Sequence, residues 1–185
     1  MKKTILLIVL LLLVNLTNDA STEIYSTNNG TITFRSEAMQ ELISATSNNL
    51  SGLMDVDQRT FAFKIPIRSF SGFNNGLQRE HFNENYLESD KFPEATFKGK
   101  IIEQVDLKKE GKYIVRAKGI LSIHGVEQES IIKGNLTVQK EMIQVDTKFS
   151  ILITDHNIKV PRVVHEKIAS EIEVTVTANF IKTRK

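Results

Sequence analysis

Apolar residues at every second position are the feature that most constrains how this chain can fold. From Tyr113 to Ile123 the alternate positions are apolar or small, and Arg116 and Lys118 stand between them. Successive side chains of a β-strand point to opposite faces, so this period predicts a strand with one buried and one wet face. The pattern recurs in several other segments: Ile32–Phe34, Phe61–Ile67, Glu94–Ile101, Ile132–Val138, Ile143–Ile153, Ile172–Phe180 and, more weakly, Leu50–Val56.

The connections between these segments favour antiparallel pairing. Gly125 with Val126, and Lys140 with Glu141, leave only short turns between successive strands, as hairpins require. About eight strands and few helices leave a β-sandwich or a closed barrel as the common solutions. The long strands favour the barrel, because closing the sheet removes long unpaired edges. We therefore predict an all-β fold, an extended eight-stranded antiparallel β-barrel, with a sandwich as the alternative.

Two segments depart from the strand period. Apolar residues between Phe73 and Leu87 follow helical spacing, which predicts a short helical insertion packed on one side. Val163–Ala169, after Pro161, predicts one or two helical turns.

The N-terminal segment predicts export. Lys2 and Lys3 precede an aliphatic run from Thr4 to Val14. A bilayer-spanning helix needs about 20 apolar residues and a secretory signal about 7 to 15, so residues 1–20 are expected to be a signal peptide cleaved near Ala20. The alternative is an uncleaved anchor. Residues 21–185 are expected to form one domain, periplasmic or otherwise exported, with no stable membrane span.

Composition and motifs argue against several function classes. The chain has no cysteine, which excludes disulfides, thiolate catalysis and zinc sites built on sulfur. Its 24 basic and 22 acidic residues are nearly balanced, so no nucleic-acid partner is expected. The histidines, His81, His124, His156 and His165, do not have metal-binding spacing. We predict no catalytic residue, no metal and no cofactor.

Small residues on the inward strand faces predict an internal space. Gly99, Gly119 and Gly134 share those faces with Phe97, Leu121 and Leu136. An eight-stranded barrel is just wide enough to be filled by side chains or to hold a small ligand, so glycines there favour a cavity. The alternative is that they ease bending of the barrel. An apolar lining would bind an apolar guest.

Two motifs carry a resemblance to a known family. Phe92-Pro93-Glu94-Ala95-Thr96-Phe97, followed by Gly119-Ile120-Leu121-Ser122-Ile123-His124-Gly125-Val126, resembles the paired signature of the YceI-like periplasmic proteins, which bind polyisoprenoid and related lipids. The resemblance implies a lipocalin-like barrel with an isoprenoid chain, a polyprenyl or quinone tail, in its channel and no catalytic residues. It implies these ligand contacts, with Phe82 and Tyr86 near the mouth: Phe63, Ile65, Phe82, Tyr86, Phe97, Leu121, Ile123, Leu136, Phe149 and Ile151.

The chain departs from the family pattern near its late turn. Ile153 stands where the family has an arginine, which removes a polar anchor for a ligand head group. Asn157 stands at the family's glycine; asparagine tolerates positive φ, so the turn is expected to persist.

The leading hypothesis is an exported protein that sequesters or carries an amphiphilic isoprenoid. A second is an enzyme acting on a lipid or small molecule, with His81, or Asp155 and His156, as acid–base groups. A third is an interaction module whose barrel is filled by its own side chains. The sequence predicts no oligomeric state.

Overall fold

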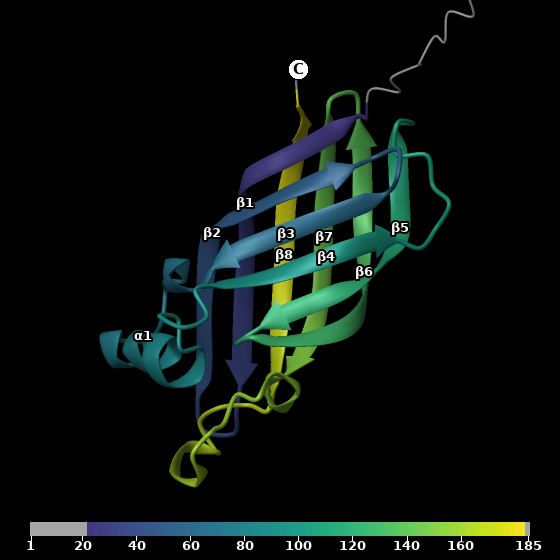
Figure 1. The fold of residues 1–185 in the computed structure, drawn as a ribbon. Helices are drawn as coiled ribbons and strands as arrows, with labels where there is room; N and C mark the ends of the chain where they lie inside the picture. Colours follow the sequence, from purple (N-terminus) through teal and green to yellow (C-terminus); the bar gives the residue numbers. More distant parts are fainter. Residues whose placement is uncertain (1–21, 184–185) are drawn as a thin grey trace, which may run out of the picture.

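A computed structural model describes residues 22–183, so the predicted signal peptide lies outside the described residues. Eight antiparallel strands form one closed barrel in chain order (Figure 1). The first strand pairs with the last, which completes the closure and confirms the barrel over the sandwich. The strands are β1 Ile24–Glu37, β2 Leu42–Asp55, β3 Thr60–Pro66, β4 Glu94–Ile101, β5 Gly111–Ile123, β6 Val126–Gln139, β7 Met142–Leu152 and β8 Glu171–Lys182.

Strand β2 begins at Leu42, well before the predicted Leu50. Two inward positions of its first half hold the small residues Ala45 and Ser47, both buried, so the apolar alternation of this half is weak. Ser47 is nevertheless satisfied, since its Oγ lies 2.6 Å from the Ser69 Oγ. A buried hydroxyl with a hydrogen-bond partner costs little, which lets a polar-looking segment continue the sheet.

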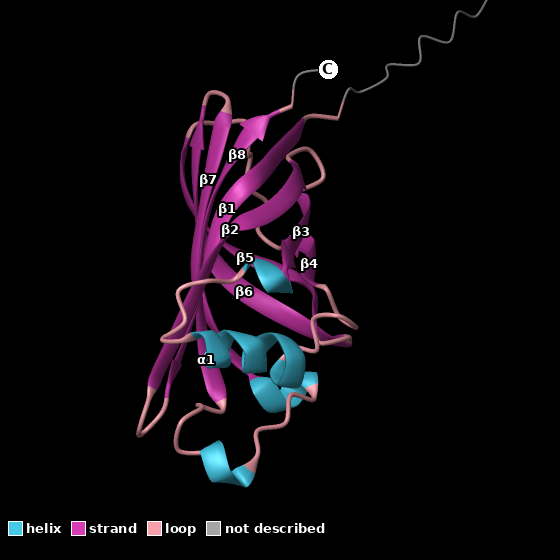
Figure 2. Cartoon of the chain, turned by 90° about the vertical axis from the view of Figure 1, so that its left-hand side faces the viewer, coloured by secondary structure: helices cyan, strands magenta, loops and turns pink. Residues whose placement is uncertain are grey.

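The predicted helical insertion is present and lies at one end of the barrel (Figure 2). It consists of α1 (Gly76–His81) and a π-helical turn (Phe82–Tyr86), and the Asn75 side chain caps α1 by accepting a hydrogen bond from the Gln78 N–H at 2.9 Å. A 3₁₀ turn, Ile67–Ser69, links β3 to it. The segment between β7 and β8 lies at the same end and holds 3₁₀ turns at Ile153–His156 and Arg162–Val164. The helical turns predicted over Val163–Ala169 are thus reduced to the second of these.

The structure separates the three inward glycines. Gly99 and Gly119 face each other across β4 and β5. A Cβ on Gly99 would lie 2.1 Å from the Lys118 carbonyl oxygen, and one on Gly119 would lie 2.2 Å from the Lys98 oxygen. These two glycines allow two backbones to approach closely, so the prediction that they leave cavity space is wrong. A Cβ on Gly134 would have its nearest neighbour at 3.5 Å, which is ordinary van der Waals contact, and Gly134 lies on the wall of the cavity described below.

The interior is filled at one end only. Near the start of β1 and the end of β8, side chains with little or no exposure close the barrel: Tyr25, Val56, Leu107, Val138, Ile143 and Phe180. This closed end lies opposite the helical insertion (Figure 1). Within residues 22–183 there is no helix of the length and apolar character needed to cross a bilayer.

Candidate binding cavity

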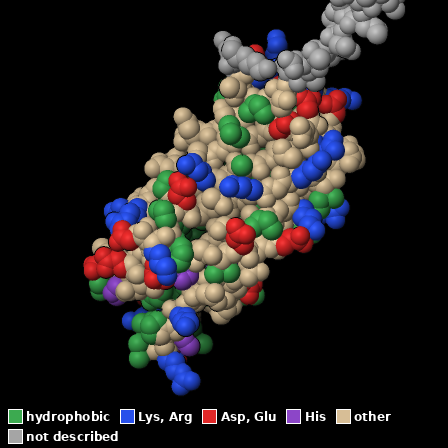
Figure 3. Space-filling model, in the orientation of Figure 1, with side chains coloured by type: hydrophobic (Ala, Val, Ile, Leu, Met, Phe, Trp, Pro, Cys, Tyr) green, Lys and Arg blue, Asp and Glu red, His purple; other side chains and the backbone are tan. Residues whose placement is uncertain are grey.

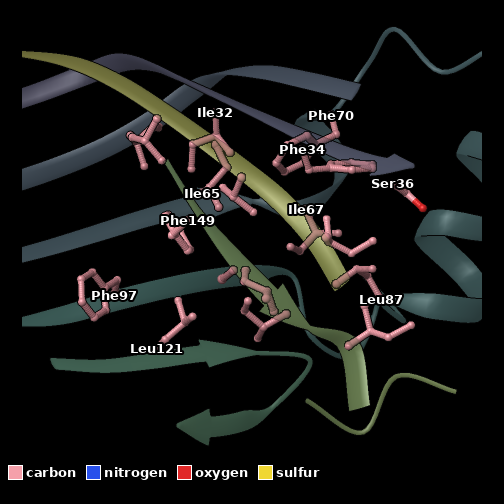
Figure 4. Close-up of a pocket in the computed structure, with 18 of the residues that line it drawn as sticks. Ile32, Phe34, Ser36, Ile65, Ile67, Phe70, Leu87, Phe97, Leu121 and Phe149 are labelled. Atoms are coloured by element: carbon pink, nitrogen blue, oxygen red, sulfur yellow. The ribbon is translucent and has the colours of Figure 1, made fainter. Parts of the chain in front are cut away.

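A cavity of about 550 Å³ occupies the half of the barrel near the insertion (Figure 4). Its wall takes side chains from every strand, because each strand turns alternate residues inward. Apolar residues dominate that wall, among them Ile32, Ile65, Leu121, Leu136, Phe149 and Val174. The prediction of a barrel filled by its own side chains is therefore wrong for this half.

The structure brings all the sequence-predicted ligand contacts to this one cavity. Each lies on its wall: Phe63, Ile65, Phe82, Tyr86, Phe97, Leu121, Ile123, Leu136, Phe149 and Ile151. Phe82 and Tyr86 come from the insertion and the others from β3 to β7. Their contact with a ligand stays a prediction. Burial raises the pKa of the Tyr86 phenol, so this group is a neutral hydroxyl in the apolar wall.

An aromatic cluster holds the insertion against the barrel. Phe34 of β1 stacks on Phe82, with ring centroids 5.2 Å apart and planes 12° apart. Phe70 and Phe73 contact the same two rings at centroid distances between 5.1 and 5.9 Å. Aromatic pairs in this range stabilise by about 0.5–1.5 kcal/mol beyond their burial. The cluster thus forms one wall of the cavity and fastens the insertion to the barrel.

Sequence reasoning missed part of this wall. Phe34 and Ile32 alternate inward on one strand, and that signal could have placed both residues at the site. Phe70 and Phe73 lie in the irregular connection after β3, where no period indicates a direction. The segment before β8 also contributes Val160 to the wall, again without a periodic signal.

Aromatic rings also make the floor of the cavity. Phe61 and Phe97 line it with centroids 5.0 Å apart, and Phe63 meets Phe180 edge-on at 5.3 Å. Phe180 is fully buried in the closed end. The floor therefore separates the empty half from the filled half.

Polar groups lie at the insertion end of the cavity. Gln78 donates from its Nε2 to the Glu41 Oε1 at 2.6 Å. The Ser36 Oγ accepts from the Ala169 backbone N–H at 2.9 Å. All three side chains line the cavity and are engaged with the protein itself. The site is thus an apolar chamber with a polar edge.

The late turn follows the prediction made from the sequence. Asn157 has φ 55° and ψ 23°, so it adopts the left-handed conformation expected at the family's glycine position. Ile153 is buried against Ile67, Leu87 and Ile158 and lines the cavity. At this position the wall presents a hydrocarbon surface in place of a cation.

The histidines have different surroundings. His124 has positive φ in the β5–β6 turn, and its ring contacts the Glu88 Oε2 at 2.6 Å and the His156 carbonyl oxygen at 3.0 Å. Glu88 lies beyond the π-helical turn and has φ 42°. The contacts of His124 tie the insertion to two turns of the barrel.

The acid–base pairs considered from the sequence are not assembled. His156 is buried, outside the cavity wall, with its Nδ1 3.3 Å from the Val126 carbonyl oxygen. Asp155 is exposed beside it in a 3₁₀ turn. His81 is the histidine that reaches the cavity within residues 22–183. No group of three or more histidine or acidic side chains in that range is placed to hold a metal ion.

The comparison with family models decides the relationship of this chain. The YceI-like domain matches it over residues 24–180, from the first strand to the last. The chain belongs to the YceI-like family. The matched residues reach from β1 into β8 of its closed barrel. Among curated proteins, none gives a significant match.

Solved structures agree with the YceI-like fold. A polyisoprenoid binding domain from Saccharophagus degradans, implicated in plant cell wall breakdown, matches with a TM-score of 0.76 and 13% identity, covering 88% of this chain and 99% of that one. Burkholderia cenocepacia BcnA matches with a TM-score of 0.68 and 14% identity over 81% of this chain and 95% of its own. A Campylobacter jejuni YCEI protein matches with a TM-score of 0.59 and 18% identity over 75% and 84%. At these identities the likeness establishes the fold.

Proposed function

We propose that this YceI-like protein binds an amphiphilic isoprenoid, with its polyprenyl or quinone tail in the cavity. The observation that carries the proposal is the apolar chamber of about 550 Å³ in an otherwise close-packed barrel. Small-molecule sites commonly have volumes of about 300–1,000 Å³ and mostly apolar walls. An unfilled apolar chamber gives up packing that the protein could have had, so a guest that fills it gains that packing.

The energetics favour a hydrocarbon tail. Burial of apolar surface contributes about 0.8 kcal/mol for each CH₂, so a five-carbon isoprene unit contributes up to about 4 kcal/mol before the cost of ordering it. The polar head group of the ligand would lie at the insertion end, next to the hydrogen-bonding side chains of Ser36, Glu41 and Gln78. The tail then lies toward the floor formed by Phe61 and Phe97.

The comparisons support the same class of ligand. The structure from Saccharophagus degradans is described as a polyisoprenoid binding domain, and its barrel covers most of this chain. Both chains share the fold at 13% identity, so the choice of ligand in this chain rests on its own cavity.

The proposed role is sequestration or transport in an aqueous compartment outside the cytoplasm. The basic and aliphatic N-terminal segment motivates export, since its length suits a signal peptide. Long isoprenoid tails have little solubility in water, and a closed apolar barrel shields them.

A binding protein fits the site better than an enzyme does. A general acid or base must come within hydrogen-bond reach of its substrate. His81 lines the cavity, whereas the rings of His124 and His156 contact other parts of the fold. The pair considered from the sequence, Asp155 and His156, does not line the cavity.

Native mass spectrometry of protein purified from its own host tests the proposal. We expect an additional mass that solvent extraction identifies as an isoprenoid, and rebinding of that lipid by delipidated protein. A His81→Ala variant is the control for the enzyme hypothesis, since binding without turnover does not require an imidazole. A folded protein that carries no lipid and takes none up on titration would refute the function.

A further inference from the structure

Apolar side chains protrude into water at the insertion end of the barrel. Met39, in the β1–β2 turn, and Val163, in the segment before β8, are each 90% exposed. Leu42, at the start of β2, is 45% exposed. Side chains with this exposure contribute little to the fold of the single chain, and apolar side chains gathered on one surface are typical of protein or membrane interaction sites.

These tips lie at the insertion end of the barrel, where the cavity has its polar edge. The Gln40 backbone N–H, next to Met39, donates to the Glu166 carbonyl oxygen at 2.8 Å. The Asn74 Nδ2, beside the insertion, donates to the Leu42 carbonyl oxygen at 2.9 Å. The three segments are therefore held together at the end where the insertion and the segment before β8 contribute cavity-lining side chains.

Cations accompany the apolar tips. Lys159 and Arg162 are exposed on the same segment as Val163, and in residues 22–183 neither has a carboxylate within ion-pair distance. Several cations elsewhere are paired, such as Lys118 with Glu129 at 3.1 Å. Figure 3 shows hydrophobic, basic and histidine side chains gathered at the tip of the molecule that this segment forms. We define the rim as Met39, Leu42, Lys159, Arg162 and Val163.

We propose that the rim docks on the surface of an anionic lipid bilayer, so that the cavity entrance faces the membrane. Apolar side chains that enter the headgroup layer, flanked by cations that meet anionic lipids, are the two components of interfacial binding. The inference rests on the lipid-binding function proposed above, because a tail passing between a bilayer and the cavity must stay out of water. Docking through the rim gives it an apolar path.

Flotation with vesicles tests the docking. Purified protein is mixed with phosphatidylcholine vesicles with or without phosphatidylglycerol, at low and high salt. We expect the wild-type protein to float with the anionic vesicles and to be released by salt, since each surface cation contributes about fivefold to partitioning. Changing Lys159→Gln and Arg162→Gln should cost about 25-fold, and adding Met39→Ser and Val163→Ser should cost about tenfold more.

A matched variant on the barrel wall is the control. Ile114 and Ile131 are 64% and 58% exposed on β5 and β6, and Lys112 and Lys133 are exposed near them. Ile114→Ser and Ile131→Ser with Lys112→Gln and Lys133→Gln therefore remove the same kinds of side chain away from the entrance. This wall variant should float as the wild type does. Thermal melts of both variants establish that they are folded.

The outcomes distinguish docking from lipid binding. None of the four substituted rim residues lines the cavity, so uptake of a detergent-solubilised fluorescent prenyl analogue should be unchanged in the rim variant. A rim variant that floats like the wild type, or a wall variant that alone fails to float, would overturn the inference. The inference would also be overturned if the wild-type protein did not bind anionic vesicles, and that result would favour a protein partner for the rim. Loss of analogue uptake by the wild type would instead refute the proposed function.

Discussion

Replacing Gly134 with isoleucine should shrink the cavity while leaving the barrel folded. Gly134 is central in β6, where it pairs with Val115 and Thr147, and it lies on the cavity wall. A Cβ at this position would have its nearest neighbour, the Thr147 Cβ, at 3.5 Å, which is ordinary van der Waals contact. A β-branched side chain also suits a strand better than glycine does. The substitution therefore projects hydrocarbon into space that is empty in the protein.

The loss of affinity follows from the volume taken from the ligand. Isoleucine adds about four carbon atoms, each equivalent to about 0.8 kcal/mol of tail burial that the ligand no longer gains. The expected penalty is about 3 kcal/mol, which is about a hundredfold in the dissociation constant. Gly134→Ala, with about one added carbon, should cost about fourfold. The two variants should form a graded series.

Fluorescence titration with a prenyl-chain analogue measures the series, and urea unfolding measures stability alongside it. Both variants should unfold at or above the wild-type urea midpoint, because an exchange of glycine for alanine in a strand contributes about 0.5–1 kcal/mol. A stable Gly134→Ile variant that binds the analogue as tightly as the wild type would show that the tail does not lie beside Gly134. That result would refute the placement of the ligand.

Four further substitutions test the surroundings of the cavity and the closed end of the barrel. Gly119→Ala should destabilise the fold by about 3 kcal/mol in urea unfolding. The added Cβ would lie 2.2 Å from the Lys98 carbonyl oxygen, so β4 and β5 must move apart and weaken two or three of the hydrogen bonds between them. A variant with the wild-type urea midpoint would contradict the close approach. Phe34→Ala should weaken analogue binding and destabilise by about 3 kcal/mol, because it removes the ring stacked on Phe82; unchanged binding would exclude the insertion from the site. His124→Ala should lose about 2–3 kcal/mol and speed hydrogen exchange in residues 82–92, which its contacts with Glu88 and His156 hold; equal exchange would argue against that tie. Glu23→Gln should lower stability at neutral pH by less than about 1 kcal/mol and should make the loss of stability in acid smaller. The Lys182 hydrogen bond holds the Glu23 pKa below 4.5, so this carboxylate stabilises the fold above about pH 4.5 and no longer does so once the pH falls through its folded pKa. Melting temperatures of variant and wild type with the same pH dependence would contradict this role.

The barrel could be predicted because its walls obey a strict period. From Tyr113 to Ile123 every second side chain is expected to face inward, and β5, Gly111–Ile123, contains this range and ends at the same residue. The first half of β2 could not be predicted, because buried Ala45 and Ser47 do not differ in type from surface residues. Burial there is decided by the neighbouring strands, which a local pattern does not contain.

The candidate site divides along the same line. Strand positions such as Phe63, Leu136 and Phe149 follow from the inward face, and the structure places all of them on the cavity. Phe70 and Phe73 depend on the path of an irregular connection, which long-range contacts with Phe34 fix. Gly99 and Gly134 look alike in the sequence, but a Cβ would clash with backbone at Gly99 and would make ordinary contacts at Gly134, and only the distance between neighbouring strands distinguishes the two cases.

The filled half of the barrel stabilises the fold, and the empty half is the proposed binding site. The closed end buries Phe180 completely, and Lys182 holds Glu23 at 2.7 Å across the meeting of the first and last strands. Phe180→Ala should therefore cost about 3–5 kcal/mol of stability. Phe149 faces the cavity, so one side of its ring has no protein atoms packed against it. Phe149→Ala should therefore destabilise the fold less than Phe180→Ala does and weaken ligand binding more. Substitutions at the closed end should therefore change mainly stability, and substitutions beside the cavity should change mainly ligand affinity. The reason is that protein side chains already supply the packing at the closed end, whereas the ligand supplies it in the cavity.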